Sequence, residues 1–195
     1  SQDVQGEVYD YPEEFFKERV HTIRRPRPDD FQIKEAADLI KKSKKPIIIA
    51  GGGVFYSDAT NELSDFAKKH NIPVTQTVMG YSSLKKDHTH YLGTIGGLGG
   101  RAANNLSKET DTAIAIGTKL ADFTTGSWAN FENPNFKLVS INAARFDANK
   151  HMAQAIVGDA KVSLMELSQA LGSWKADDNW YKKSRKELKD WEAYV

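Results

Sequence analysis

The sequence contains no cysteine. This absence excludes disulfides, thiolate metal sites and cysteine nucleophiles from these 195 residues. It is compatible with a reducing cytoplasm, where we expect the protein to reside. No apolar run approaches the roughly 20 residues that a membrane span needs, so we expect no membrane partner. The sequence also lacks a clear excess of positive or negative residues, since 27 basic and 26 acidic residues give a net charge of +1. No overall electric field therefore favours the binding of nucleic acid.

Several catalytic motifs are also missing. The sequence has no Gly-x-Ser-x-Gly, no His-Glu-x-x-His and no Gly-Lys-Ser/Thr of a phosphate-binding loop. Asp87, His88 and His90 could be considered as metal ligands, but they lie close together without a further placed ligand, which favours a surface loop. We therefore expect no catalytic residue and no metal site in this chain, which looks like a binding or scaffold domain.

A starting methionine is missing as well. The chain begins at Ser1 and stops at Val195 within a helical pattern, and we interpret it as a domain excised from a longer protein. Its length suffices for one α/β domain with a substantial core.

Residues 45–53 are the most informative stretch. A proline that can begin a strand, three isoleucines and three glycines predict a buried strand that runs into a tight turn. We expect Ser57 or Asp58 to cap the helix that follows, and residues 70–71 to end it. A glycine turn at this place lets backbone N–H groups approach a phosphate. A tight turn without a ligand explains the glycines equally well, so both interpretations stay open.

The rest of the chain alternates strand and helix patterns. We predict further strands at 72–78, 112–116, 137–142 and 155–157, and helices from Asp29 or Asp30 to 42, through 102–106 and from 160 to 171. Such alternation predicts right-handed crossovers and a Rossmann-like parallel sheet with helices on both faces, an α/β fold.

The carboxyl ends of parallel strands meet at one edge of a sheet. We therefore expect the residues that follow the predicted strands to share a rim: 51–53, 77–80, 117–125, Asn142 and Asp159. A long loop from Gly80 to Gly93 leads into the glycine-rich stretch 93–100, where close approach of backbone to backbone or to a ligand is expected.

The two ends of the chain carry less regular patterns. Residues 3–11 suit an extended segment, and 13–20 suit a short helix. The stretch 24–28 is basic and punctuated by proline; it could bind phosphate, but we favour a solvated linker. From Asp177 a charged helix carries an apolar stripe, which predicts packing either on a partner outside the domain or on the domain's own core.

Three stretches together resemble the central domain of thiamine-diphosphate-dependent enzymes of the acetolactate synthase and pyruvate decarboxylase group. They are 45–53, 116–126 and 157–160, and their order and spacing are more specific than any one of them. The resemblance covers nearly the whole chain and implies a DHS-like NAD/FAD-binding fold.

The resemblance also implies a division of the chain. Residues 1–28 would be a lead-in and linker from a missing amino-terminal pyrimidine-binding domain, and 29–173 would be the central α/β domain. Residues 174–195 would be a charged helix leading to a missing carboxyl-terminal diphosphate-binding domain.

Within this group, four segments are most similar to hydrolases of myo-inositol catabolism: 6–12, 87–88, 122–127 and 142–151. The resemblance implies a parent enzyme that cleaves a C–C bond of a cyclic trihydroxy-1,2-dione to 5-deoxyglucuronate. It implies a small-molecule substrate, thiamine diphosphate with magnesium, and a homo-oligomer. The stretch 158–160 lacks the third glycine of the magnesium motif, and no Asn-Asn follows it. We therefore predict that this chain alone binds no thiamine diphosphate and is inactive.

In flavin-using members of the group, the rim holds FAD. Eight residues match positions that line it: Gly51, Gly52, Gly53, Thr77, Gly96, Gly117, Asp122 and Asp159. However, Lys119 and Phe123 stand where those members have two arginines, and Leu98 and Asn142 stand where they have histidine and an acidic residue. These departures favour a vestigial crevice. Two alternatives stay open: an FAD-holding domain of an acetolactate synthase-like carboligase or decarboxylase, and a stand-alone nucleotide-binding enzyme of the related sirtuin-like fold.

Overall fold

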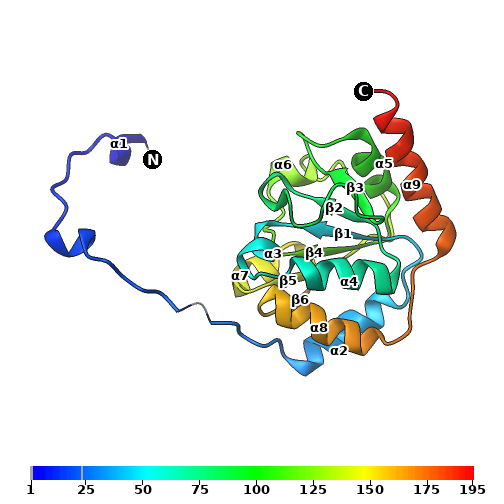
Figure 1. The fold of residues 1–195 in the computed structure, drawn as a ribbon, viewed down its shortest axis with the longest axis horizontal. Helices are drawn as coiled ribbons and strands as arrows, with labels where there is room; N and C mark the ends of the chain where they lie inside the picture. The colour runs from blue at the N-terminus through cyan, green and yellow to red at the C-terminus, as the bar shows by residue number, and fades with distance from the viewer. Residues whose placement is uncertain (1, 23) are drawn as a thin grey trace.

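A parallel sheet forms the centre of the molecule (Figure 1). The computed structural model describes residues 2–22 and 24–195. In these residues six strands pair in the order β3-β2-β1-β4-β5-β6, and every pair is parallel. The strands are β1 (Pro46–Ala50), β2 (Val74–Gln76), β3 (Tyr91–Thr94), β4 (Thr112–Ile116), β5 (Lys137–Asn142) and β6 (Gln154–Val157). The predicted α/β class is confirmed.

Helices cover both faces of the sheet. On one side lie α2 (Asp30–Ile40), α4 (Thr60–His70) and α8 (Ala160–Leu171); on the other lie α5 (Arg101–Glu109) and α9 (Asp178–Glu192) (Figure 1). Shorter helices are α1 (Gln2–Gln5), α3 (Gly52–Tyr56), α6 (Asp122–Thr125), α7 (Arg145–Ala148) and the 3-10 turns η1 (Glu13–Phe16), η2 (Val78–Gly80) and η3 (Lys150–Met152). None of the helices in the described part of the chain is long and apolar enough to cross a membrane.

The two central strands are buried along their whole length. Every residue of β1 and β4 is buried, because helices pack on both faces of the sheet. This explains why residues 47–49 can all be isoleucine, without the alternation that a half-exposed strand would show.

The chain after β1 differs from the prediction. Helix α3 begins at Gly52, inside the glycine triplet, and α4 begins only at Thr60. The expected caps Ser57 and Asp58 therefore lie between two helices, and the residue before α4 makes no side-chain capping bond. The predicted end of the helix is confirmed, since α4 stops at His70 and Asn71 adopts a left-handed conformation with φ of 56°.

Strand β3 was expected to be loop. It contains only four residues, and Gly93 within it has φ of 99°. Its strand conformation is fixed by pairing with β2, where the register shifts between Val74 and Thr75. Such pairing is not visible in the local sequence, so the prediction missed the sixth strand.

The apolar stripe of α9 packs on the core of this domain. Trp180 and Leu188 are buried, and the indole Nε1 of Trp180 donates to the carbonyl of Pro46 at 2.8 Å. Of the two predicted interpretations of this stripe, packing within the domain is confirmed.

On each outer strand of the sheet, one backbone group is paired with a side chain. The backbone N–H of Val157 in β6 donates to Oε1 of Gln32 on α2 at 2.9 Å. At the opposite edge, Nη1 of Arg185 on α9 donates to the carbonyl of Tyr91 in β3 at 2.9 Å.

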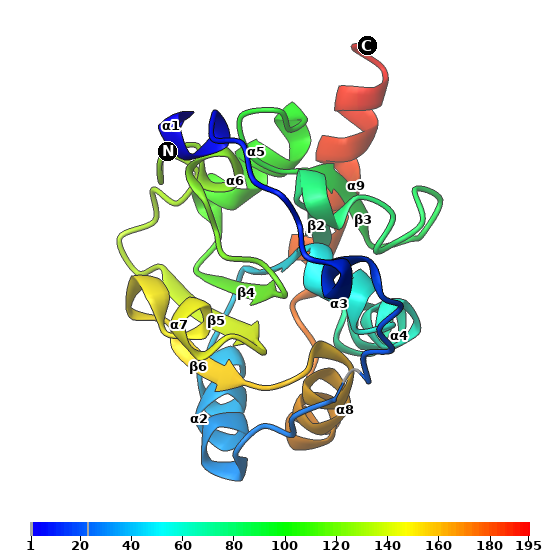
Figure 2. The ribbon, with the colours of Figure 1, turned by 90° about the vertical axis from the view of Figure 1, so that its left-hand side faces the viewer.

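Residues 2–22 form an arm outside the body of the domain, and all of them are exposed. Residues 2–5 are helical where an extended segment was expected, and the helix predicted over 13–20 is only the turn η1. The arm lies on the side of the body where α3, α6 and α7 follow the ends of their strands (Figure 1). Seen from that side, it projects across the body (Figure 2).

Candidate functional site

A groove of about 450 Å³ lies at the carboxyl edge of the sheet. Its walls come mainly from the loops after the adjacent strands β1, β2 and β4, and the segments that follow β3 and β5 complete them. Four of the eight predicted cofactor-binding residues line it: Gly52, Gly53, Thr77 and Gly117. The other lining residues are Tyr56, Val78, Met79, Ile95, Thr118, Lys119, Ala121, Phe123, Thr124, Asn142 and Asp147.

The glycines at the back of this groove are needed for backbone packing. A Cβ on Gly51 would lie 2.4 Å from the carbonyl oxygen of Gly117, and a Cβ on Gly53 would lie 2.6 Å from its Cα. The N–H of Gly51 donates to Ile116 at 2.8 Å, and that of Gly53 donates to Gly117 at 2.9 Å. Two of the three N–H groups of the triplet are thus already paired with carbonyls. Close approach of two loops accounts for these glycines without a ligand.

Gly96 has a similar role in the next pair of loops. Its φ is 101°, and a Cβ at this position would lie 2.0 Å from the carbonyl oxygen of Phe123. That carbonyl accepts the N–H of Gly97 at 2.7 Å. The glycine-rich stretch after β3 therefore packs on the loop after β4, as the prediction of close backbone approach required.

Thr77 and Asp122 contribute less to the groove than predicted. The hydroxyl of Thr77 accepts the N–H of Gly80 at 3.0 Å, and so it caps η2 at the groove wall. Asp122 begins α6, is exposed and does not line the groove.

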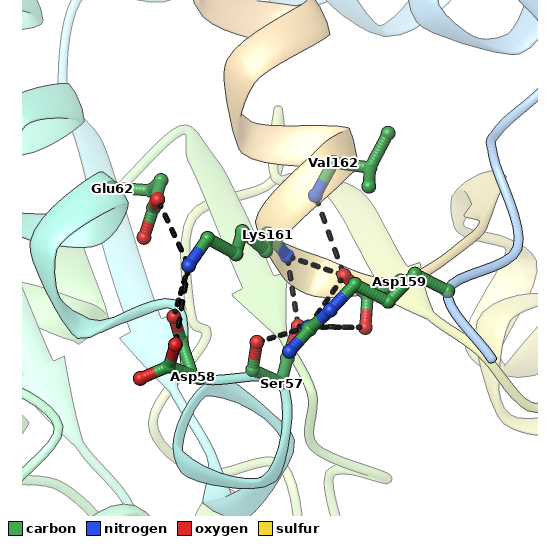
Figure 3. A network of polar contacts seen from close by, with 7 residues as sticks. Ser57, Asp58, Glu62, Asp159, Lys161 and Val162 are labelled. Atoms are coloured by element: carbon green, nitrogen blue, oxygen red, sulfur yellow. Dashed lines mark hydrogen bonds and ion pairs between the residues drawn. The ribbon is translucent and has the colours of Figure 1, made fainter. Parts of the chain in front are cut away.

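Asp159 is the only predicted rim residue that sits in a dense polar network (Figure 3). It caps α8 by accepting the N–H groups of Lys161 and Val162, and its Oδ2 lies 2.7 Å from the hydroxyl of Ser57. Lys161 continues the network to Asp58, at 3.2 Å. A second cavity, of about 210 Å³, is lined by Asp159 and shares Gly53, Tyr56, Gly117 and Asn142 with the groove.

Arg25 completes this network from the linker. Its Nη1 lies 3.2 Å and 3.3 Å from the two carboxylate oxygens of Asp159, and it also donates to the carbonyl of Ser57. The N–H of Asp159 donates to the carbonyl of Pro26 at 2.8 Å, which holds the linker against the start of α8. Residues 24–27 are exposed, as expected of a solvated linker, but the sequence did not predict the ion pair between Arg25 and Asp159. A partner 134 residues away leaves no local signal in the sequence.

The histidines of the loop before β3 are structural. Burial, with help from the nearby charges of His88, Arg185 and Lys68, lowers the pKa of His90 from 6.5 to about 4. Its Nε2 lies 3.2 Å from Oδ1 of Asn71, and its ring packs on Tyr181 of α9, with centroids 4.6 Å apart. Within residues 2–22 and 24–195, no three acidic or histidine side chains are grouped as a metal site would need.

Sequence reasoning missed the apolar character of the groove. Tyr56, Val78, Met79 and Phe123 line it and are all largely exposed. They come from three separate short stretches of the sequence, so no periodic pattern marks them as a set, and only the strand order brings them together.

Comparison with known proteins is consistent with this architecture. Relatives with the name 3D-(3,5/4)-trihydroxycyclohexane-1,2-dione hydrolase include proteins from Clostridium perfringens strain 13, 49% identical over 87% of this chain, and Clostridium tetani, 42% identical over 98%. A relative from Bacillus cereus strain ZK, whose name is the same with the number 1 added, is 44% identical over 87% of this chain. The chain spans 26 to 30% of the length of these relatives. Residues 33–167 match the family described as thiamine pyrophosphate enzyme, central domain. With most of its length inside that match, the chain belongs to the family of thiamine pyrophosphate enzyme central domains.

Proposed function

We propose that this chain is the central domain of an enzyme that hydrolyses a C–C bond of 3D-(3,5/4)-trihydroxycyclohexane-1,2-dione in inositol catabolism. The observation that carries this proposal is the 49% identity, over 87% of the chain, to a relative named for that hydrolysis. The alternative, an FAD-holding domain of a carboligase or decarboxylase, has no comparable support.

The proposed role of this domain is scaffolding. The groove is lined by backbone, apolar side chains, three threonines, one asparagine, one lysine and one aspartate, and the aspartate, Asp147, is paired with Lys150 at 2.7 Å. This set fits neither thiamine pyrophosphate nor magnesium, which would need a grouped set of oxygen ligands. We propose that flanking domains of the longer protein, outside these 195 residues, bind both cofactors and the substrate. We further propose a cytoplasmic homo-oligomer.

The rim does not fit a flavin dinucleotide either. The N–H groups of Gly51 and Gly53 already donate to carbonyls, so they are not free for a diphosphate. The carboxylate of Asp159 is already paired with Arg25. Lys119 is the only cation among the groove-lining residues and cannot give the planar pair of donors that an arginine gives. These three observations support the proposal of a vestigial crevice.

The test is an assay of the longer protein that contains this chain. With magnesium and thiamine pyrophosphate, we expect ring opening of the trihydroxycyclohexanedione, detected by mass spectrometry, and no carboligation product from pyruvate. The opposite pair of results would replace the proposal by the carboligase alternative.

A second measurement addresses this chain alone. Calorimetric titration with thiamine pyrophosphate and magnesium is expected to give no binding heat, and the purified chain is expected to show no flavin absorption band. Micromolar binding of the cofactor, or a flavin band, would contradict the scaffold role.

A further inference from the structure

The carboxyl edge carries an exposed apolar surface, which we call the apolar rim. It consists of Tyr56, Val78, Met79 and Phe123, which are 74%, 52%, 73% and 76% exposed and all line the groove. Large apolar side chains gathered around a concave surface mark a place where something binds.

The arm carries a second apolar surface, an aromatic cluster of Tyr9, Tyr11, Phe15 and Phe16. The rings pack on one another, with centroids 4.6 Å apart for Tyr11 and Phe15 and 5.5 Å apart for Tyr9 and Tyr11. Each side chain is nevertheless at least 57% exposed. Among the described residues, this cluster has aromatic contacts only within itself. In the part of the chain that the structure describes, one apolar surface without a partner thus lies on the body and another lies on the arm.

The arm is attached at the rim. Arg25 and Pro26 hold its base against Asp159, and Arg24 lines the cavity next to the groove. The arm also lies on the side that the rim faces (Figures 1 and 2).

The length of the arm permits contact with the rim. Phe16 is eight residues and Tyr9 fifteen residues from Arg24. Extended chain covers about 3.3 Å per residue, which gives a reach of roughly 26 to 50 Å. Six strands about 4.8 Å apart span roughly 24 Å, so the cluster can reach any point along the rim.

The charges of the two surfaces are complementary. Residues 2–16 contain five acidic residues and no lysine or arginine, and one of the five, Glu14, pairs with Lys17 just after the segment. The groove contains Lys119, which forms no ion pair within the described chain, and its acidic lining residue Asp147 is already paired with Lys150. Arg24, in the adjoining cavity, adds a second cation. The arm is therefore acidic and aromatic, whereas the groove is apolar and carries the cation Lys119, which is unpaired among the described residues.

We propose that the arm folds back over the rim of its own chain, with the aromatic cluster packed on Met79 and Phe123. The arm then acts as a strap that encloses the groove and controls access to it. A short tether gives an effective concentration in the millimolar range, so the chain's own arm outcompetes the arm of a second copy at micromolar protein. The strap does not depend on which reaction the longer protein performs.

Cross-linking tests the strap directly, because the chain has no cysteine of its own. The probe is a short bismaleimide applied to the full chain carrying Phe16→Cys and Met79→Cys at micromolar concentration. We expect a link within one molecule, seen as a mass increase of the monomer. The matched control carries Phe16→Cys and Lys137→Cys, because Lys137 begins β5 at the opposite edge and is exposed. Its linking rate is expected to be at least tenfold lower.

A further pair of variants tests the aromatic contact. Added to the Phe16→Cys, Met79→Cys chain, Phe15→Ser is expected to slow linking several-fold, whereas Val20→Ser, at an exposed arm position outside the cluster, is expected to leave the rate unchanged. Equal rates for the rim pair and the opposite-edge pair would overturn the strap. Links formed mainly between two molecules would overturn it in favour of a second copy. Circular dichroism of each variant verifies the fold before cross-linking.

Discussion

At the scale of single residues, Gly51 determines how closely the loops after β1 and β4 approach. A Cβ there would lie 2.4 Å from the carbonyl oxygen of Gly117 and 2.6 Å from Cβ of Thr118. Gly51→Ala must therefore separate the two loops. We expect it to lower the free energy of unfolding by about 1–3 kcal/mol, the usual cost of overpacking. Urea denaturation measures this change.

Gly97→Ala is the matched control for this substitution. The nearest atoms to a Cβ at Gly97 lie 3.8 Å and 3.9 Å away, so the methyl group fits. We expect a change within about 0.5 kcal/mol. If Gly51→Ala changed the free energy of unfolding as little as Gly97→Ala, close packing against Gly117 would not explain the glycine at position 51.

Arg25 and Arg27 provide a second comparison at this scale. Arg25 pairs with the buried carboxylate of Asp159, whereas the side chain of Arg27, which pairs with Glu166, is 75% exposed. Removing Arg25 leaves this buried carboxylate without its cation, although Ser57 and the start of α8 still donate to it. We expect Arg25→Ala to lower the free energy of unfolding by about 1–3 kcal/mol, the usual cost of removing one partner of a buried polar group.

For Arg27→Ala we expect at most about 1 kcal/mol, as for other surface ion pairs. Both variants are measured by urea denaturation under the same conditions. Equal losses of unfolding free energy in the two variants would show that the buried carboxylate of Asp159 does not need Arg25 as its cation.

At the scale of elements, the sequence predicted what local pattern controls. The aliphatic run 47–49 predicted β1, and the stop at Asn71 predicted the end of α4. Strand β3 and helix α3 were not predicted, because both contain glycine and are held by neighbouring elements rather than by their own propensity. The same limit applies to the site. The rim residues were predicted from strand order, but the contacts of Arg25 and the apolar character of the groove arise from residues far apart in sequence.

The loop before β3 makes the stability of the domain sensitive to acid. The pKa of His90 is lowered to about 4 in the folded protein, so the unfolded chain binds a proton more readily. The contribution of neutral His90 to the free energy of unfolding is therefore complete above pH about 6.5. It is lost as the pH falls towards 4, which lowers the free energy of unfolding by up to about 3 kcal/mol. Burial also lowers the pKa values of His70 and His88, which act in the same direction.

His90→Gln removes this share of the acid sensitivity. We expect its unfolding free energy, measured by urea denaturation from pH 7 to pH 4, to fall less steeply than that of the wild type. His21→Gln, at an exposed position on the arm, is the control and is expected to follow the wild-type profile. Parallel curves for all three proteins would exclude His90 as the cause.

At the scale of the whole molecule, the folded unit includes α9. Trp180 and Leu188 are part of the core, and Lys183 on the same helix pairs with Glu109 of α5. We expect a chain ended after residue 173 to unfold or aggregate. Trp180→Ala should cost about 3–5 kcal/mol, the usual cost of emptying a large buried aromatic site.

Trp191→Ala is the control for the helix itself. Trp191 is only half-buried near the end of α9, so we expect a clearly smaller loss than for Trp180→Ala. Calorimetric melting of the three chains checks this order. A stable chain that ends at 173 would place α9 outside the folding unit.

Gln32 and Arg185 have a consequence for assembly. An uncovered outer strand invites another chain to add a strand and extend the sheet, which is a common origin of fibrils. Here a glutamine amide pairs with one backbone N–H of one outer strand, and a guanidinium pairs with one carbonyl of the other. Copies of this domain should therefore associate through side-chain surfaces and form complexes of limited size, rather than polymerise through continuous backbone pairing.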